Sequence, residues 1–244
     1  MRSYFRRHFR AVQVQHFEKL ASAEGPLIVY GNHSSWWDPM LITLLASVYL
    51  PHRKHYAPMA DEQLLRYPIL RKIGIFPVAM RSSRGAAEFL GTAQAILNSG
   101  GVLWITPQAR FADVRERPLR FKAGLAMLAL RVPGVQLLPL AAEYTFWDER
   151  LPETLGRFGD PLKMPADATV ESATAQLEAA LEQSMDELRE AARTRDFRQF
   201  TTVLNGRRGT GGFYGIRQMF GSWVGGKKHF RDHTPRERDG GDAE

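Results

Sequence analysis

Residues 32–38 carry the side chains with the clearest catalytic potential in this sequence of 244 residues. They read Asn-His-Ser-Ser-Trp-Trp-Asp and follow a short apolar run at residues 27–30. A histidine at a strand end and an aspartate at the next helix start can lie within hydrogen-bonding distance. Such an aspartate fixes the tautomer of the imidazole and stabilises its cation, so His33 is predicted to be a general base partnered by Asp38. A loop histidine that merely bonds a helix cap is the alternative, because the spacing alone is weakly specific.

Two further loops carry arginines that suit an anionic ligand. Arg81 and Arg84 flank the start of a predicted helix, where guanidinium groups and free backbone N–H groups together bind anions. Gln108 and Arg110 follow a predicted strand in the next such loop. Loops beyond the carboxyl ends of strands gather the active residues of open α/β sheets, so these loops are expected to meet the His33 loop. Solvated loop arginines are the alternative interpretation.

Strands and helices that alternate along the chain must position these loops. The hydrophobic pattern predicts strands at residues 27–30, 54–57, 75–78, 102–106, 135–144 and 155–162, with Pro139 splitting the fifth. It predicts helices at residues 38–50, 61–67, 83–98, 121–131 and 170–195. This order indicates an α/β fold, a single domain with a mostly parallel or mixed central sheet flanked by helices.

The two ends of the chain differ from this pattern. Apolar side chains at near-helical spacing alternate with arginines over residues 4–20, which predicts an amphipathic basic helix, either a first core helix or an interfacial one. Glycine, aromatic and basic residues dominate beyond residue 200. We therefore divide the chain into an N-terminal helix at residues 1–22, a central domain at 23–198 and a partly disordered basic glycine/aromatic tail at 199–244.

Composition excludes several classes of chemistry. The chain has no cysteine, so disulfide scaffolds, thiolate zinc sites, iron–sulfur clusters and cysteine nucleophiles are excluded. The net charge of +7 favours a polyanionic partner such as an anionic membrane face, a phosphorylated metabolite or nucleic acid. The longest apolar run, residues 41–50, is far shorter than the roughly 18 to 20 residues of a spanning helix. Any membrane contact is therefore expected to be peripheral.

Four sequence blocks, taken in order, resemble the pattern of the lysophospholipid (glycerolipid) acyltransferase family, the PlsC-like His-x4-Asp enzymes. The resemblance covers roughly residues 25–145, and its first block is the most specific. The blocks are Asn32-His33-x4-Asp38, then Gly74-Ile75-Phe76-Pro77-Val78 leading to Arg81, then Pro107-Gln108-x-Arg110, then Val135-Gln136-Leu137-Leu138-Pro139.

This resemblance implies transfer of a fatty acyl chain from acyl-CoA or acyl carrier protein to a hydroxyl of a lysophospholipid or other lipid acceptor. It implies that His33 is the base and Asp38 its partner, and that no metal or cofactor other than the acyl donor takes part. The residues it implies in substrate binding are Asn32, Arg81, Arg84, Gln108 and Arg110. The third block departs from the family's Phe-Pro-Glu-Gly-Thr-Arg, having glutamine for glutamate and one residue fewer, which leaves the acceptor open between phosphate-bearing and other lipids.

An anionic membrane surface is the partner that we expect, with the chain cytoplasmic and peripherally associated with the inner face of the cell membrane. The main alternative is a non-catalytic lipid- or nucleic-acid-binding module that uses the basic aromatic tail, although nucleic acid is the less economical partner. An inactive homologue that serves as a lipid-binding scaffold is a third hypothesis. A metal site at His52, His55 and Asp61 matches no strong spacing, and residues 221–228 lack the hydroxyl residue of a P-loop.

Overall fold

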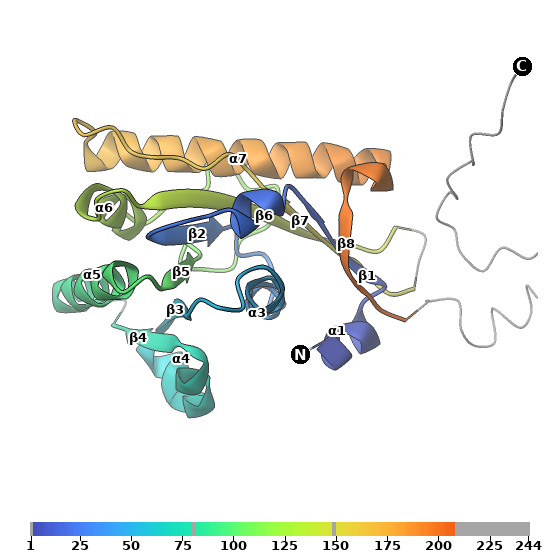
Figure 1. The fold of residues 1–244 in the computed structure, drawn as a ribbon, viewed down its shortest axis with the longest axis horizontal. Helices are drawn as coiled ribbons and strands as arrows, with labels where there is room; N and C mark the ends of the chain where they lie inside the picture. The colour runs from blue at the N-terminus through green and yellow to red at the C-terminus, as the bar shows by residue number, and fades with distance from the viewer. Residues whose placement is uncertain (1, 80–81, 148–149, 208–244) are drawn as a thin grey trace, which may run out of the picture.

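A computed structural model describes residues 2–79, 82–147 and 150–207 (Figure 1). Within this part of the chain, eight strands form one mixed sheet in the order β4-β3-β5-β2-β6-β7-β1-β8. The strands are β1 (Ala11–Gln15), β2 (Leu27–Gly31), β3 (His55–Ala60), β4 (Ile75–Val78), β5 (Val102–Ile105), β6 (Gln136–Thr145), β7 (Glu153–Phe158) and β8 (Thr201–Asn205). The β6–β7 and β1–β8 pairs are antiparallel, and the other neighbouring pairs are parallel. The predicted α/β domain with a mixed sheet is confirmed.

Helices cover both faces of this sheet (Figure 1). They are α1 (Arg2–His8), α2 (Glu18–Ala21), α3 (Asp38–Tyr49), α4 (Asp61–Arg66), α5 (Ser83–Asn98), α6 (Gly124–Arg131) and α7 (Val170–Thr194), with the 3-10 turns η1 (Pro68–Ile73) and η2 (Phe197–Gln199). α7 begins with a capping box between Thr169 and Ser172 and lies along the sheet on the same side as α6. α1, α3 and α4 lie on the opposite side.

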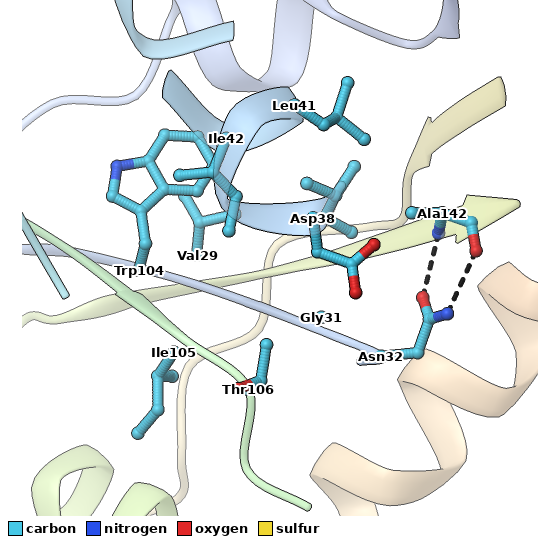
Figure 2. Close-up of a pocket in the computed structure, with 11 residues that line it drawn as sticks. Val29, Gly31, Asn32, Asp38, Leu41, Ile42, Trp104, Ile105, Thr106 and Ala142 are labelled. Atoms are coloured by element: carbon cyan, nitrogen blue, oxygen red, sulfur yellow. Dashed lines mark hydrogen bonds between the residues drawn. The ribbon is translucent and has the colours of Figure 1, made fainter. Parts of the chain in front are cut away.

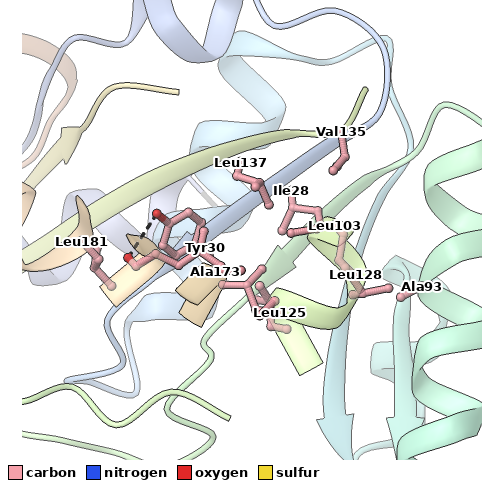
Figure 3. Packing of buried hydrophobic residues seen from close by; sticks show 14 of the residues in the cluster. Ile28, Tyr30, Ala93, Leu103, Leu125, Leu128, Val135, Leu137, Ala173 and Leu181 are labelled. Carbon is pink, nitrogen blue, oxygen red and sulfur yellow. Dashed lines mark hydrogen bonds between the residues drawn. The ribbon is translucent and has the colours of Figure 1, made fainter. Parts of the chain in front are cut away.

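Alternation along the central strands divides the interior into two apolar cores. In β2, Ile28 and Tyr30 join the core beneath α5, α6 and α7 (Figure 3), whereas Leu27 and Val29 join the core beneath α1 and α3. The Tyr30 hydroxyl donates to the backbone oxygen of Leu177 at 3.3 Å, and burial raises the pKa of this phenol well above its usual value. β2 is therefore fixed on both faces, which makes its carboxyl end a firm support for a site.

The prediction of one helix over residues 4–20 is wrong, because residues 11–15 form strand β1. β1 pairs in parallel with β7 and antiparallel with β8, and all five of its residues are buried. The glutamine side chains are accommodated by polar partners, since Gln13 donates to Glu153 at 2.5 Å and Gln15 accepts from Arg157 at 2.7 Å. Period-two alternation of valine and glutamine, rather than helical spacing, is the pattern that the sheet uses here.

The predicted domain boundaries and the predicted break at Pro139 also need correction. β1 and β8 are strands of the main sheet, so boundaries at residues 22 and 198 would cut through it. β6 runs unbroken through Pro139, whose carbonyl accepts from Gly159 just beyond the end of β7. Proline has no backbone N–H to donate. Pro139 lies just outside the last residue pair of the antiparallel β6–β7 ladder, Leu140 with Phe158, so no hydrogen bond of that ladder is lost. The rest of the predicted tail, residues 208–244, lies outside the described residues.

Candidate active site

His33 and Asp38 form a hydrogen-bonded pair at the carboxyl end of β2. The strand ends at Gly31 and α3 begins at Asp38, so the intervening loop brings the two side chains together. His33 Nδ1 lies 2.8 Å from Asp38 Oδ2, and Asp38 is 3% exposed. Because a carboxylate can only accept, Nδ1 carries the proton and Nε2 is left as the basic nitrogen. The pairing expected from the sequence is present.

The Asp38 carboxylate receives two further hydrogen bonds. The backbone N–H of Ser35 donates to Oδ2 at 2.9 Å, and the Tyr144 hydroxyl donates to Oδ1 at 2.6 Å. Burial, followed by the charge of Asp38 and the hydrogen bond to it, raises the pKa of Tyr144 far above its usual value, so its proton stays in place. Tyr144 is not among the residues expected from the sequence, and it stands 106 residues beyond its partner.

Asn32 and Gln108 lie at the site, but their side chains brace its backbone. Figure 2 shows the Asn32 amide in two hydrogen bonds with Ala142 of β6, donating at 2.9 Å and accepting at 2.8 Å. Gln108 Oε1 accepts from the backbone N–H of His33 at 3.3 Å. Both residues are buried. They therefore hold the His33 loop against β6 and against the loop after β5, which suits positioning better than the substrate contact expected of them.

An exposed aromatic side chain lies against His33, and two tryptophans stand in the same loop as His33. The Phe111 ring lies 4.1 Å from the imidazole, centroid to centroid, and Phe111 is 56% exposed. Trp36 is exposed, whereas Trp37 packs edge-on against Phe9 of the apolar core at 4.6 Å. Phe111 is therefore the exposed aromatic ring that lies directly against His33.

Two of the three arginines expected to bind the acceptor, Arg84 and Arg110, are paired with carboxylates. Arg110 bonds to Glu116 in the same loop, and this bond raises the pKa of the guanidinium and lowers that of Glu116. Arg84 bonds to Glu88 one helical turn away at 2.8 Å, on the exposed side of α5. The structure brings Arg110 close to the site through its neighbour Phe111 but shows no contact between Arg84 and the His33–Asp38 pair. Arg81 lies outside the described residues.

Two cavities flank the carboxyl end of β6. A cavity of about 20 Å³ lies beside Asp38, lined also by Trp104 and Thr106 (Figure 2), and is large enough for about one water. A larger cavity of about 270 Å³ lies between β6, α7 and the segment after Phe111, with Glu143 in its wall. Burial raises the pKa of Glu143, and the nearby Arg189 opposes this rise.

The histidine cluster weighed as a metal site has another role. His55 Nδ1 accepts from Trp104 Nε1 at 3.1 Å, and Nε2 donates to the backbone oxygen of Leu50 at 2.9 Å. The indole N–H can only donate, so His55 Nδ1 is unprotonated and the neutral ring bridges Trp104 and Leu50, in agreement with burial, which lowers the pKa of His55. Among the described residues, no three metal-ligating side chains gather. The helices in the same part of the chain include none that is long and apolar enough to cross a bilayer.

Comparison with known proteins places this geometry in a family. A family model described as Acyltransferase matches residues 11–143, which is more than half of the chain. The crystal structure of the 1-acyl-sn-glycerophosphate acyltransferase PlsC from Thermotoga maritima superposes with a TM-score of 0.54 at 19% identity, covering 73% of this chain and 72% of that one. The ATPase DotB of Legionella pneumophila matches with a TM-score of 0.33 at 12% identity, covering 72% of this chain and 54% of that one, which is too weak to support an argument. No curated protein matches the sequence. The chain belongs to the acyltransferase family and shares its fold with PlsC.

Proposed function

We propose that this protein transfers a fatty acyl group from a thioester, acyl-CoA or acyl carrier protein, to a hydroxyl of a lysophospholipid or another lipid acceptor. The observation that carries the proposal is the buried Asp38 carboxylate bonded to Nδ1 of His33, because it leaves Nε2 as a base at the rim of the site. Family membership supports the reaction class, and the exposed Phe111 ring against His33 supports an apolar substrate.

The reaction needs one proton acceptor and proceeds without an acyl-enzyme. His33 Nε2 takes the proton of the acceptor hydroxyl as its oxygen attacks the thioester carbonyl carbon. The tetrahedral intermediate then collapses, its C–S bond breaks, and the departing thiolate takes the proton from the imidazolium. Asp38 stabilises the imidazolium between these two steps, so its charge acts where positive charge develops.

Arg110 is the arginine best placed to recognise an anionic head group on the acceptor. It shares a loop with Phe111, whose ring lies against His33, and its side chain is about half exposed. A phosphate competes with Glu116 for the same guanidinium, since both are oxyanions that accept from its fork of N–H groups. Arg81 and Arg84 are proposed as further contacts to the head group.

We place the protein at the inner face of the cell membrane as a peripheral enzyme, with an anionic lipid surface and an acyl donor as its partners. A lipid acceptor resides in a bilayer, and the net charge of +7 favours an anionic one.

Thiol release from palmitoyl-CoA over a panel of lysolipid and glycolipid acceptors tests the function. The chain has no cysteine, so a disulfide dye reads the released thiol without protein background. We expect acceptor-dependent release that His33→Ala lowers by about 10²- to 10⁴-fold, as for loss of a general base. His52→Ala, an exposed loop histidine, is the matched control and should leave the rate unchanged.

Two outcomes would contradict the proposal. Equal rates for His33→Ala and the parent would exclude His33 as the base. Silence with both palmitoyl-CoA and palmitoyl acyl carrier protein across the panel would favour a non-catalytic lipid-binding protein.

A further inference from the structure

The connection between β3 and β4 turns large apolar side chains toward solvent. Eight large hydrophobic side chains are exposed in the described part of the chain. Four of them fall in one stretch of nine residues, 65–73, which spans the end of α4 and η1. Leu65 is 72% exposed, Tyr67 60%, Ile69 63% and Ile73 56%. Leu64 is fully buried and anchors α4 to the fold. The outward direction of its neighbours is therefore part of a packed element, and such a concentration marks a contact site.

Three cations lie among these apolar side chains. Arg66, Arg71 and Lys72 are exposed, and within the described residues none of them forms an ion pair. We call these three residues, together with Leu65, Tyr67, Ile69 and Ile73, the α4–η1 surface. Aliphatic side chains alternating with lysine and arginine suit a segment that lies in a lipid head-group layer, with the aliphatic groups below and the cations at the phosphates.

We propose that the α4–η1 surface docks onto an anionic lipid bilayer. The surface carries three cations, and the start of α4 adds only the two carboxylates of Asp61 and Glu62, so a second copy of the chain would bring an excess of positive charge into the interface. The segment 208–244 has seven lysines and arginines against five acidic residues, so its charge does not complement the surface either. A bilayer accepts four large apolar side chains without matching pockets, whereas a protein partner must supply a pocket for each.

Topology places the start of this surface at the edge of the sheet that carries His33. β3, β5, β2 and β6 are parallel neighbours, so their carboxyl ends share one edge. α4 begins directly after the carboxyl end of β3, and the His33 loop begins after that of β2. Figure 1 shows α4 beside β4 at the end of the sheet. η1 leads into the amino end of β4, so the surface runs from the edge that carries His33 toward the opposite edge of the sheet.

Vesicle flotation with the full chain tests the docking. The probe is a vesicle of phosphatidylcholine with phosphatidylglycerol, and the variant is Leu65→Ser, Ile69→Ser, Ile73→Ser combined. We expect at least about a tenfold loss of vesicle affinity, because the apolar area that enters the bilayer is removed. A second variant, Arg66→Gln, Arg71→Gln, Lys72→Gln, should weaken binding to anionic vesicles and not to phosphatidylcholine alone. Lys54→Gln, Arg131→Gln, Lys163→Gln removes the same number of exposed charges elsewhere and is its control.

Unchanged vesicle affinity in the serine variant would overturn the proposal. So would unchanged vesicle affinity accompanied by weaker binding of acyl carrier protein, or by a smaller oligomer, because these outcomes assign the surface to a protein. The proposal relies on the proposed function for the lipid-borne acceptor. Vesicle binding is measured without turnover, however, so a failure of one is distinguishable from a failure of the other.

A second inference follows from an independent observation, the bond between Tyr144 and Asp38. The hydroxyl donates to Oδ1 at 2.6 Å while His33 occupies Oδ2, so each carboxylate oxygen has its own side-chain donor. Titratable or charged groups on the elements around this pair are His8 on α1, whose ring contacts Trp37, and Arg110 with Glu116 on the loop after β5. Within the described residues, none of these three groups has a hydrogen bond to Asp38, so His33 and Tyr144 are its side-chain donors.

We infer that Tyr144 is a positioning residue of the proposed reaction. Its hydroxyl holds the Asp38 carboxylate in the plane that His33 requires, and its hydrogen bond takes up part of the negative charge of that carboxylate. A purely structural hydroxyl would stabilise the fold without affecting His33. Tyr144→Phe keeps the ring and removes the hydroxyl. Tyr30→Phe also removes a buried hydroxyl, the one bonded to Leu177, and is the matched control for a structural role.

The test measures the pH–rate profile of thiol release and, by NMR, the protonation of the His33 imidazole. In Tyr144→Phe we expect kcat to fall about tenfold at constant KM, because the carboxylate loses one of its orienting donors. We also expect the acid limb and the imidazole titration to move to higher pH, since the unshared carboxylate stabilises the imidazolium more strongly. Tyr30→Phe should move neither. An unshifted imidazole titration in Tyr144→Phe would refute the inference, even if no acyl transfer were detected.

Discussion

The base and the cations of this site are held in different ways. Asp38 is buried and accepts three hydrogen bonds, two from His33 and Ser35 of its own loop and one from Tyr144 of β6. Arg110 is about half exposed and is bonded within its own loop to Glu116. The His33–Asp38 pair is therefore organised before substrate arrives, whereas the head-group contact requires Arg110 to exchange one carboxylate for another oxyanion.

This difference separates the reaction from its specificity. A preorganised base supplies the same chemistry to any hydroxyl that reaches Nε2. An arginine on a surface loop can exchange partners at small cost, because an exposed ion pair contributes little to stability. We therefore expect substitutions at the His33–Asp38 pair to change kcat and substitutions in the Arg110 loop to change the KM for the acceptor.

Asp38→Asn should have the largest effect. An asparagine amide can present its oxygen to only one neighbour, so the His33 ring loses either its tautomer or its orientation, and imidazolium is no longer stabilised. We expect kcat to fall about 10²- to 10⁴-fold, with the KM for the acceptor nearly unchanged. Thiol-release kinetics check this expectation, and an acceptor KM that rises while kcat holds would reverse the assignment of roles.

Gly31→Ala should disturb the packing of β2 against β6, which positions the His33–Asp38 pair. A Cβ at Gly31 would lie 2.6 Å from the backbone oxygen of Leu140, so β2 and β6 must separate just before Asn32 and His33. We expect the free energy of unfolding to fall by about 1–3 kcal/mol and kcat to fall about tenfold.

Gly91→Ala in α5 is the matched control, because its Cβ would meet nothing within 4 Å. It should raise stability by about 0.5–1 kcal/mol through helix propensity and leave the rate unchanged. Urea denaturation and thiol release measure both variants. If Gly31→Ala were as active and as stable as the parent, β2–β6 packing would not be what holds His33.

The sequence predicts the local half of this site and misses the part that depends on long-range register. His33 and Asp38 are five residues apart, and a strand end followed by a helix start is enough to pair them. Tyr144 reaches Asp38 only because β6 pairs with β2 in a register that places Tyr30 opposite Pro139. No local pattern encodes this register. Strand β1 was missed for a related reason, since its buried glutamines are satisfied by Glu153 and Arg157 far along the chain.

Arg110→Gln and Glu116→Gln sharpen the comparison at the loop. If Arg110 binds the acceptor head group, Arg110→Gln raises the KM for a phosphate-bearing acceptor about tenfold at constant kcat, as for loss of a charge-assisted contact. Glu116→Gln removes the competing carboxylate and should lower that KM. Initial rates over a range of acceptor concentrations give both values. A KM insensitive to both substitutions would make the Arg110–Glu116 pair a purely structural feature of the loop.

Ala109→Gly should have the smallest effect and tests the backbone between Gln108 and Arg110. Ala109 has φ +55°, in the left-handed region that disfavours a Cβ, at the turn of the loop that supports His33 through Gln108. Glycine relieves this strain but adds conformational freedom to the unfolded chain, so we expect a net gain of up to about 1 kcal/mol. Ala95→Gly in α5, with ordinary helical backbone, should instead lose about 1 kcal/mol.

The kinetic effect of Ala109→Gly shows whether the His33–Asp38 pair and the Arg110 loop act independently. The hydrogen bonds of Asp38 come from the His33 loop and β6, so relaxing Ala109 should leave kcat within about twofold. Arg110 follows the relaxed residue directly, so the KM for the acceptor should change more than kcat does. A fall in kcat at constant KM would show that the bond from His33 to Gln108 transmits the loop's conformation to the base, and that reaction and specificity are coupled through the backbone.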